Sequence, residues 1–261
     1  MNPALWVAKT GLDAQQTRLQ VVSNNLANAS TTGFKKDRAV FEDLLYQNYR
    51  QPGAQATQDS TLPSGLMLGT GVRVAGTQKM HLQGGFVQTG NALDMAIEGN
   101  GFFQVIRPDG STAYTRNGQF QLNEQGQVVT NDGYQLDPSI VVPENMVSLT
   151  IGTDGTVSAL EPGNTAPTNL GTIETAQFIN PAGLMPIGEN QFLETQSSGA
   201  PTTGIPGLDG RGSLLQGSLE SSNVNTVEEL VNLIETQRAF EMNSKSISTA
   251  DQMMSFFTNN V

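Results

Sequence analysis

Apolar residues recur every seven positions near both ends of the chain. One row consists of Leu5, Leu12, Leu19 and Leu26, and the other consists of Leu233, Phe240, Ile247 and Met254. A spacing of seven places side chains along one stripe of an α-helix, as in the seam of a coiled coil. Long helices are therefore predicted at both ends, and we expect the two rows to be subunit-packing positions.

Signals for the ends of these helices lie nearby. Gly33 follows the first helix, where a glycine in a left-handed conformation commonly ends a helix. Thr226-Val-Glu-Glu229 has the pattern of a capping box and is predicted to begin the second helix. A further apolar set broadens the face of that helix: Val227, Val231, Ile234, Met242, Met253 and Phe257. A helix that is apolar on more than one side needs neighbours on more than one side.

The two helices alone are predicted to pair weakly. Burying a large apolar side chain contributes roughly 1.5–3 kcal/mol, whereas ordering the backbone costs ~1–2 kcal/mol for each residue. Short helices in water are marginal for the same reason. We expect the termini to become ordered when many subunits pack them side by side. A single intramolecular hairpin that caps the rest of the chain is the alternative.

Residues 72 to 215 follow a different pattern, in which short β-favouring runs alternate with turn signals. The runs include Phe102–Ile106, Phe120–Leu122, Val128–Thr130 and Val147–Ile151. The turn signals include Asp109-Gly110, Asn117-Gly118, Asp132-Gly133 and Asp154-Gly155, which suit tight hairpins. The pattern predicts an antiparallel β domain, and the expected fold class is α+β, mainly β. Calcium loops are not expected, because no alternating ligand series with a terminal Glu follows.

Two stretches show little periodicity. Residues 47–63 are rich in Gln, and residues 197–212 are rich in Gly and Pro. Their composition alone predicts loops. A long loop in a compact body tends to be functional or disordered.

The charge balance excludes one class of partner. The net charge is −11, and charged residues make up only 14% of the chain. Proteins that bind nucleic acid need a basic face. The nearest candidate is Lys35, Lys36 and Arg38, which we interpret as a solvated helix end or interface rim, with an anion site as the alternative. No nucleic-acid partner is expected.

The chain has no cysteine, which excludes thiolate chemistry and disulfide staples. The beginning of the sequence lacks the pattern of a secretory signal, and no run reaches the roughly 20 apolar residues of a membrane helix. We expect a protein that stays in the cytoplasm or leaves by a route that reads no cleaved signal, without direct membrane insertion.

The search for catalytic chemistry finds little. His81 is the single histidine, and it is expected at the surface or a strand edge. Gly65–Gly71 lacks the Gly-Lys-Ser/Thr ending of a phosphate loop, and Gly99-Asn-Gly101 lacks the third glycine of a dinucleotide fingerprint. A glycosidase pair of carboxylates stays open, although nothing points to one. We expect no enzyme activity, no catalytic residues, no cofactor and no metal site.

Three motifs carry a family resemblance. The segments Ser23–Lys35 and Glu220–Ile234, together with Gly101–Val105 and Ala113–Gly118, are similar to the signatures of the flagellar rod and hook axial proteins. The signature positions are Asn24, Asn25, Asn28, Gly33, Phe34, Asn223 and Asn225. Two terminal signatures and a central one in the expected order make this resemblance specific.

The stretch from Tyr46 to Leu66 resembles the insert that marks the distal-rod members of this family. The residues expected to stiffen the rod are Arg50, Gln51, Pro52, Gly53 and Pro63. Residues 56–60 depart from the family pattern. The alternatives are a proximal rod or hook-type subunit and, from a different class, a secreted β-domain adhesin or hydrolase.

The resemblance implies an architecture and a location. Residues 1–33 and 222–261 would form an inner coiled-coil tube, 34–71 and 211–221 a connecting region with a hairpin-like extension at 46–66, and 72–210 an outer β domain. The subunit would polymerise in the periplasmic basal body as a drive shaft. The implied partners are copies of itself, proximal rod proteins, the hook protein, the ring proteins of the outer membrane and peptidoglycan layer, the rod cap and the type III export apparatus.

Overall fold

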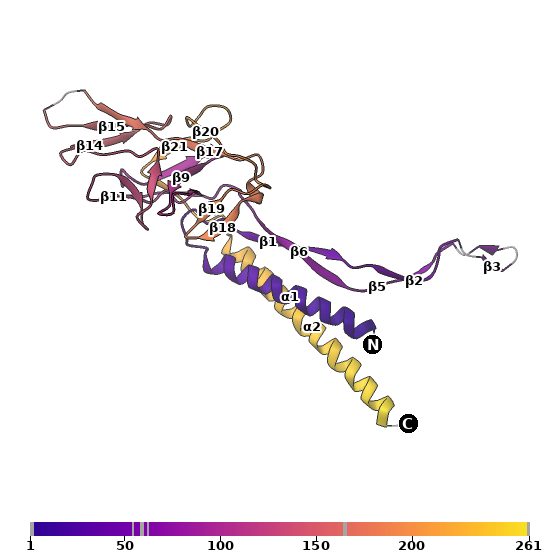
Figure 1. Ribbon diagram of the computed structural model, residues 1–261. Helices are drawn as coiled ribbons and strands as arrows, with labels where there is room; N and C mark the ends of the chain where they lie inside the picture. Colours follow the sequence, from indigo (N-terminus) through magenta and orange to yellow (C-terminus); the bar gives the residue numbers. More distant parts are fainter. Residues whose placement is uncertain (1–2, 54, 58–59, 62, 164–165, 260–261) are drawn as a thin grey trace. The chain divides into compact units, whose positions relative to one another are not determined.

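The computed structural model describes residues 3–53, 55–57, 60–61, 63–163 and 166–259 (Figure 1). The chain forms two compact units. The helical unit comprises Met1–Ala27, Asp37–Gln78 and Asn225–Val261, and the β unit comprises Asn28–Lys36 and Lys79–Val224. The chain therefore passes from one unit to the other at four places, after Ala27, Lys36, Gln78 and Val224.

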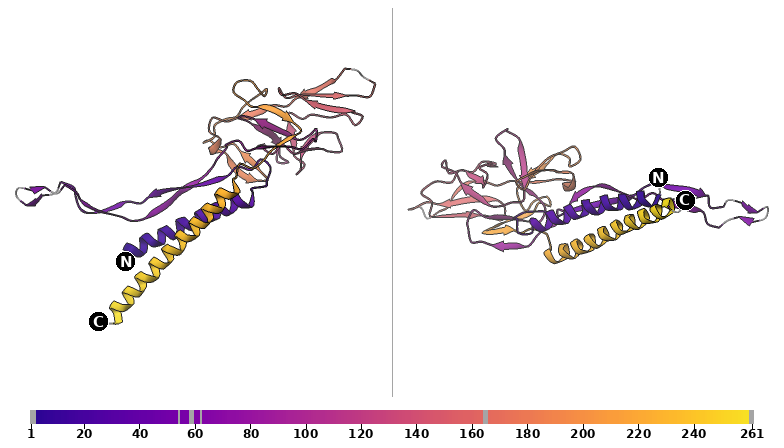
Figure 2. Two further views of the ribbon diagram at one scale, coloured as in Figure 1. Left: turned by 180° about the vertical axis from the view of Figure 1, so that it is seen from behind. Right: turned by 90° about the horizontal axis from the view of Figure 1, so that it is seen from below.

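The helical unit contains the two long helices α1 (Pro3–Ala27) and α2 (Thr226–Asn259), as the apolar rows predict. Both views in Figure 2 show them along each other. Asn25 lies against Glu229, and Gly11 lies against Asn243, so the two helices run antiparallel. Over their described residues, neither helix contains an apolar stretch of the length that crosses a bilayer.

Short two-stranded ribbons complete the helical unit. Strand β1 (Asp37–Asp43) pairs with β6 (Val72–Lys79), β2 (Tyr46–Arg50) pairs with β5 (Leu66–Gly69), and β3 (Gln55–Thr57) pairs with β4 (Ser60–Thr61). The loop predicted for residues 47–63 from composition is thus wrong where β2, β3 and β4 lie. Tyr46 and Tyr49 favour a strand, and the leucines of β5 provide its partner.

The β unit is an assembly of antiparallel strands. The strands are β7 (Phe86–Gln88), β8 (Met95–Glu98), β9 (Phe102–Ile106), β10 (Thr112–Thr115), β11 (Phe120–Leu122), β12 (Val128–Thr130), β13 (Gln135–Asp137), β14 (Ser148–Ile151), β15 (Thr156–Leu160), β16 (Thr168–Thr172), β17 (Thr175–Gln177), β18 (Met185–Gly188), β19 (Gln191–Leu193), β20 (Thr202–Gly204), β21 (Ser213–Gln216) and β22 (Ser218–Glu220), with a 3₁₀ helix at Pro181–Gly183. The runs predicted at 102–106, 120–122 and 128–130 are strands with those bounds, and β14 begins one residue later than predicted. The strand β20 interrupts the second predicted loop.

One larger sheet organises this unit. Its strand order is β11-β12-β13-β9-β10-β19-β18, and β17 joins it by pairing with β9 and β20. Strands β14, β15 and β16 form a separate three-stranded sheet, while β8 pairs with β21 and β7 pairs with β22. Asp132-Gly133 lies in a tight turn, and Gly133 adopts the left-handed conformation (φ 87°) expected at such a dipeptide.

The core of the β unit lies on both faces of β9. Phe103 and Val105 belong to a large apolar cluster with Phe120, Leu136 and Ile173, whereas Phe102 belongs to a smaller aromatic cluster. Successive side chains of a strand point to opposite faces, so β9 serves both clusters. The rings of Phe103 and Phe120 meet edge to face at 5.2 Å between centroids.

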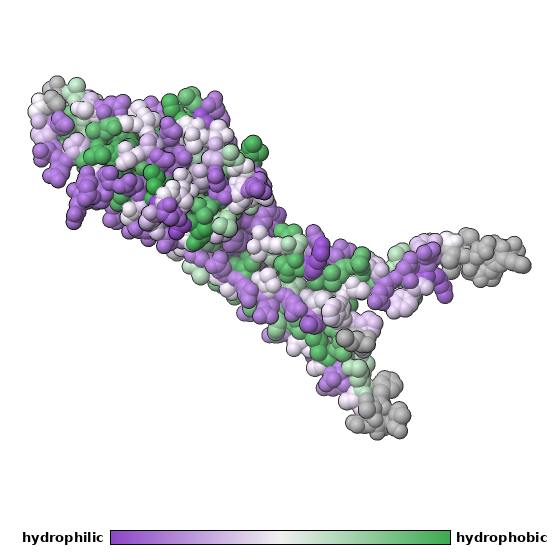
Figure 3. All heavy atoms as spheres, viewed as in Figure 1, coloured by the Kyte–Doolittle hydropathy of each residue, from purple (hydrophilic) through white to green (hydrophobic). Residues whose placement is uncertain are grey.

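Figure 3 shows apolar residues on the surface of the helices and of the neighbouring ribbons. The exposed large apolar residues of α2 are Val227, Leu230, Val231, Ile234, Phe240, Met242, Met253, Met254 and Phe256. Those of the β2–β5 ribbon and the residue before it are Leu45, Tyr46, Tyr49, Leu66, Met67 and Leu68. Exposed apolar surface of this extent marks an interaction site.

Candidate functional site

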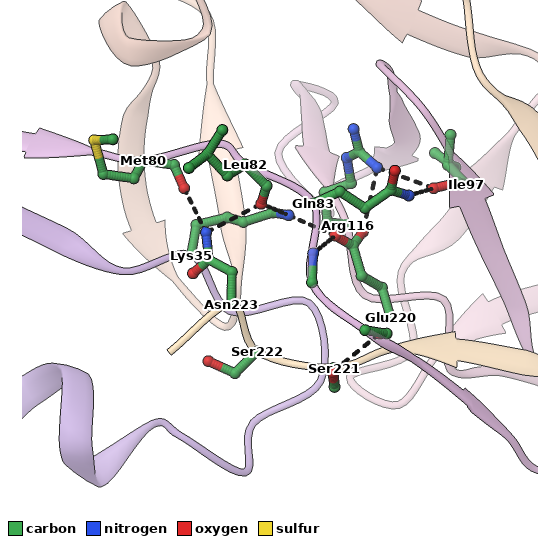
Figure 4. A network of polar contacts seen from close by, with 12 residues as sticks. Lys35, Met80, Leu82, Gln83, Ile97, Arg116, Glu220, Ser221, Ser222 and Asn223 are labelled. Atoms are coloured by element: carbon green, nitrogen blue, oxygen red, sulfur yellow. Dashed lines mark hydrogen bonds and ion pairs between the residues drawn. The ribbon is translucent and has the colours of Figure 1, made fainter. Parts of the chain in front are cut away.

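Three segments of the β unit meet at a polar cluster that we call the junction (Figure 4). The segments are residues 33–36, 80–84 and 220–223, and the residues that bind them together are Lys35, Arg116, Glu220 and Asn223. Two of the three segments belong to the terminal signatures of the sequence. The structure therefore brings the two signatures together, which their distance in the sequence does not show.

Glu220 is the centre of the junction and is fully buried. One carboxylate oxygen accepts a hydrogen bond from Lys35 Nζ at 2.6 Å and another from the Gly84 amide at 2.9 Å. The other oxygen accepts one from Arg116 at 3.2 Å. Lys35 Nζ also donates to the Leu82 carbonyl at 2.7 Å. Arg116 also donates to the carbonyls of Ile97 in β8 and of Gly99. Every charge of this triad therefore has a polar partner.

Burial and charge act against each other in this triad. Burial lowers the pKa of Lys35 and of Arg116, while the negative charge of Glu220 works against both shifts. A buried charge is tolerated only when it is paired, and removing one partner of a buried ion pair typically costs about 3–5 kcal/mol. The solvated helix end expected at Lys35 is wrong, because its side chain is fully buried against Glu220.

Asn223 links the same three segments through one side-chain amide. Its Oδ1 accepts a hydrogen bond from the Lys36 amide at 2.8 Å. Its Nδ2 donates to the carbonyls of Met80 at 2.8 Å and Leu82 at 3.0 Å. The Met80 amide in turn donates to the Lys36 carbonyl at 2.9 Å. The side chain thus uses both its donor and its acceptor atoms within the cluster.

Glycine is required where the segments come closest. Gly33 has a φ of +70°, its amide donates to the Glu220 carbonyl at 2.8 Å, and an added Cβ would lie 2.7 Å from the Asn117 backbone nitrogen. At Gly84 an added Cβ would collide with the carbonyl of Ser221. Gly33 was predicted as the stop of the first helix, which is wrong because α1 ends at Ala27, six residues earlier. The left-handed backbone of Gly33 instead allows this close approach.

His81 lies beside the junction. It was expected at the surface or a strand edge, and it is half-buried two residues after the end of β6. Both ring nitrogens are shielded from solvent and lack a hydrogen-bond partner among the described residues. The ring packs edge-on against Phe102 and Phe192 at 5.5 and 5.4 Å. The pKa of His81 is lowered from 6.5 to about 4, first by burial and then by repulsion from the nearby Lys35, Arg116 and Lys79.

A cavity of about 230 Å³ opens at His81 and is also lined by Asn100, Arg116 and Gln177. The charged groups that act on His81 from nearby are cations. Across the described residues, no group of three or more His, Asp and Glu side chains could hold a metal ion. In its described residues, the β unit is a packed structural framework.

The predicted packing rows occupy intermediate positions on the helices. Leu5, Leu12, Leu19, Leu26, Leu233 and Ile247 are half-buried, whereas Phe240 and Met254 are 43% and 39% exposed. Of the second apolar set, the side chain of Phe257 lies outside the described residues, and the other five members are exposed. The assignment of these rows to contacts between subunits stays a prediction.

Polar and small residues fill the seam where α1 and α2 meet. The amide of Asn25 donates to Glu229 at 3.4 Å and to the Asp37 carbonyl at 2.9 Å. Gly11 faces the amide of Asn243, which lies 3.1 Å from the position of an added Cβ. Glu229, Thr236 and Ala250 are buried, and they follow the same spacing of seven as Asn243. A search for apolar rows misses this set, although its period is visible in the sequence.

Two apolar grooves lie on the helical unit, one beside this seam and one between α1 and the β2–β5 ribbon. One of about 410 Å³ is lined by Gln15, Gln16, Leu19, Thr236, Gln237, Phe240 and Glu241. A second, of about 320 Å³, is lined by Pro3, Trp6, Val7, Gln47, Leu68, Gly69 and Thr70. Both offer more apolar than polar surface. Each is a place where an apolar side chain of another chain could enter.

The remaining signature residues serve local structure. Asn225 caps α2, since its Oδ1 accepts from the amides of Val227 at 3.1 Å and Glu228 at 3.4 Å. The N-cap is therefore Asn225, one residue before the start of the predicted capping box. Glu229, the last residue of that predicted box, instead accepts a hydrogen bond from Asn25. Asn24 bonds to Asp37, and Asn28 accepts from the Thr31 hydroxyl. Phe34 is buried beneath Lys79, whose Nζ lies 5.0 Å from the ring centre.

The residues expected to stiffen the rod lie beyond the β2–β5 ribbon. Arg50 ends β2, and Gln51, Pro52, Gly53 and Pro63 follow as exposed residues. The two strands approach closely at this end of the ribbon, because a Cβ added to Gly65 would lie 2.4 Å from the Arg50 carbonyl and 2.8 Å from Pro52. The role of these residues in stiffness stays a prediction.

Family models match three parts of the chain. The model of the flagella basal body rod protein matches residues 5–35, that of the D1 domain of the flagellar hook protein FlgE/F/G matches residues 96–159, and that of the C-terminal part of the flagellar basal body rod FlgEFG proteins matches residues 215–261. Two of these matches contain the signatures that meet at the junction.

Similar proteins match over nearly the whole chain. The flagellar basal-body rod protein FlgG of Buchnera aphidicola subsp. Schizaphis graminum is 56% identical over 97% of this chain and 98% of its own length. The FlgG proteins of Borreliella burgdorferi and Bacillus subtilis are 46% and 37% identical over 99% of this chain, and over 98% and 99% of their own lengths. The chain therefore belongs to the family of flagellar basal-body rod proteins FlgG, and it is a structural subunit of the distal rod rather than an enzyme.

Proposed function

We propose that the chain builds the rod by packing the apolar outer face of its terminal helices against further copies of itself. The observation that carries this proposal is the inverted polarity of α2. Asn25, Glu229 and Thr236 are buried between or beside the helices, while Val231, Phe240 and most other large apolar residues of α2 face outward. Such a pair gains most by burying its outer face on neighbours.

In this proposal α1 and α2 pair as a coiled coil and form the inner tube of a helical polymer. The division follows the resemblance, with residues 1–33 and 222–261 inside, 34–71 and 211–221 connecting, and 72–210 outside. The apolar rows then act as subunit-packing positions. The two apolar grooves of the helical unit would receive side chains from adjacent copies.

We further propose that residues 46–66 form a hairpin-like extension that braces neighbouring subunits. Its support is the pairing of β2 with β5 and the exposure of both tyrosines of β2. A two-stranded ribbon is marginal alone in water, so this one gains stability by lying on another surface. Pro52 and Pro63 restrict the backbone there and would resist bending.

The proposed setting is the periplasmic part of the basal body, which the chain would reach through the flagellar type III export apparatus without a cleaved signal. The proposed partners are the proximal rod proteins, the hook protein, the rod cap and the surrounding rings of the outer membrane and peptidoglycan layer. The family membership supports association with rod and hook components in general. The full-length matches leave the adhesin and hydrolase alternatives without support.

The direct test is a charge in the proposed packing row. Leu12→Asp or Ile247→Asp should prevent polymerisation, because an unpaired charge in an apolar contact between subunits is strongly unfavourable. Asn131→Asp adds the same charge to an exposed turn of the β unit and serves as the control. Basal bodies examined by electron microscopy should show truncated rods for the first two variants and complete rods for the control. Complete rods from either the Leu12→Asp or the Ile247→Asp variant would refute the proposal.

Deleting residues 47–63 tests the extension separately. Rods should still assemble, because the helix faces are intact, but they should bend more easily. The persistence length of purified rods, measured from electron micrographs, reports this directly. An unchanged persistence length would remove the stiffening role and leave the packing proposal in place.

A further inference from the structure

We propose that Glu220 and Asn223 are positioning residues that tie the three segments by which the chain leaves the β unit into one common base. All four passages between the units lie at the ends of segments 28–36, 79–84 and 220–224. Without cross-links, each segment could move separately where it leaves the β unit. The junction residues remove that freedom.

The bonds of the junction run between segments. Glu220 holds the first segment through Lys35 and the Gly33 amide, and it holds the second through the Gly84 amide. Asn223 repeats this pattern through Lys36 and Met80. Each of the two residues therefore connects its own segment to both of the others.

The triad also anchors this base to the large sheet through β10 and to the separate β8–β21 pair. Arg116 follows β10 and connects Glu220 to the carbonyls of Ile97 in β8 and of Gly99. Gln83 adds a second connection, because its amide donates to the Ile97 carbonyl at 2.8 Å and accepts from the Gly99 amide at 3.2 Å. Movement of one segment must therefore disturb bonds to the other segments and to the sheet.

The consequence rests on the proposed function. In a subunit of a drive shaft, force reaches the β unit through these segments. A cross-linked base distributes that force over the sheet, whereas separate segments would act as hinges. Asn223 shares this cross-linking role with the ion pairs, because its single side chain bonds to both of the other segments.

Hydrogen exchange of the full chain, resolved to single amides by NMR spectroscopy, tests the proposal. Asn223→Ala removes the acceptor of the Lys36 amide, so faster exchange there is expected from local loss alone. A common base predicts more. The amides of Gly33 and Met80, which do not bond to the Asn223 side chain, should also exchange at least about tenfold faster. Amides of β9 should be unchanged.

Asn180→Ala is the matched control, since Asn180 donates to the Ser197 carbonyl at 3.0 Å elsewhere in the β unit. It should leave all three segments protected. The proposal is overturned if Asn223→Ala affects the Lys36 amide alone.

A second variant keeps the test decisive if Asn223→Ala unfolds the β unit. Asn223→Asp retains an acceptor for the Lys36 amide but cannot donate to the carbonyls of Met80 and Leu82. Gly33 and Met80 should then exchange faster while Lys36 stays protected, and unchanged exchange at both would refute the common base. The measurement uses single chains, so its result does not depend on whether rods assemble as proposed.

Discussion

The β unit and the helical unit use apolar residues in opposite ways. In the β unit, Phe103, Phe120 and Leu136 are almost fully buried in a closed core. In the helical unit, the buried positions of α2 are Glu229, Thr236 and Ala250, while the largest apolar side chains face outward. A chain that only had to fold alone would bury these side chains first. The β unit therefore has a closed core of its own, whereas α2 leaves its largest apolar side chains exposed, as the proposed packing between subunits requires.

Buried polar groups show the same contrast. In the junction, each charge of the Lys35–Glu220–Arg116 triad has partners at 2.6–3.2 Å. In the helix seam, the bond between Asn25 and Glu229 is longer, at 3.4 Å. Each cluster also has one buried atom without a partner among the described residues, Arg116 Nε in the junction and Gln15 Oε1 in the seam. Buried polar networks stabilise a single arrangement when they are satisfied and cost free energy when they are not. The junction is thus the stronger determinant of a unique structure.

The largest effect that separates the two units is expected from one substitution made in each. Phe103→Ala should lower the free energy of unfolding of the β unit by about 3–5 kcal/mol, because it leaves a cavity in a closed core. Phe240→Ala should change the stability of the single chain by less than about 1 kcal/mol, because the ring is 43% exposed. Urea unfolding followed by circular dichroism and by exchange of β9 amides measures both.

The two substitutions should have the opposite order of effect on assembly. Phe240→Ala should impair polymerisation of the chain more than its small effect on stability suggests. Polymer yield is compared at a urea concentration where both variants remain folded. Equal loss of stability from the two substitutions would show that the helical unit has a closed core of its own.

The sequence predicts those parts of the fold that depend on local pattern. The terminal helices and strands such as β9 and β12 follow from periodicity and turn residues close to them in the chain. The partners of Lys35 do not, because Glu220 is 185 positions away and nothing local distinguishes a buried lysine from a solvated one. The family signatures identified the right segments, yet the reason for Asn223 became visible only when the segments were brought together.

The helix seam shows a second limit. Rows of large apolar residues are a reliable sign of burial when a chain folds alone. Here the buried row of α2 includes Glu229 and Thr236, and the period of seven is shared by several rows at once. Periodicity predicted the helices correctly. It did not predict which face of α2 meets α1, because several rows of α2 share the same period.

A smaller effect is expected from pH, and it acts on the β unit alone. His81 is the single histidine, and its pKa is lowered from 6.5 to about 4 by burial and by neighbouring cations. The unfolded chain therefore binds a proton more readily, so stability is lost as the pH falls from 6.5 toward 4. The β unit should be about 2 kcal/mol less stable at pH 5 than at pH 7.5 through this group.

His81→Phe tests the source of that loss. It keeps an aromatic ring against Phe102 and Phe192 but cannot be protonated, so the difference between pH 7.5 and pH 5 should shrink by about 2 kcal/mol. Fluorescence of Trp6, the single tryptophan, reports on α1 in the same samples and should show no matching change. An equal pH dependence with and without the imidazole would assign the loss to carboxylates instead.

A difference of similar size is expected when threonine is replaced by valine in each unit. The Thr115 hydroxyl donates to the Asn190 carbonyl at 2.9 Å and accepts from the Asn117 amide at 3.0 Å. Thr115→Val leaves both groups without that partner, and the β unit should lose about 1–3 kcal/mol. Thr236 donates only to the Asn232 carbonyl one turn earlier in α2, at 2.6 Å, and that carbonyl also has a helix partner.

Thr236→Val should therefore be neutral or stabilise the helix pair by up to about 1 kcal/mol, since it places a methyl group in a buried seam at no cost in unpaired groups. Both residues are β-branched, so helix propensity changes little. Urea unfolding followed by Trp6 fluorescence measures the helical unit, and exchange of β9 amides measures the β unit. A loss of more than about 1 kcal/mol from Thr236→Val would mean that the hydroxyl is needed in the seam. The polar row of α2 would then stabilise the pair directly, and the contrast between a satisfied junction and a poorly satisfied seam would no longer hold.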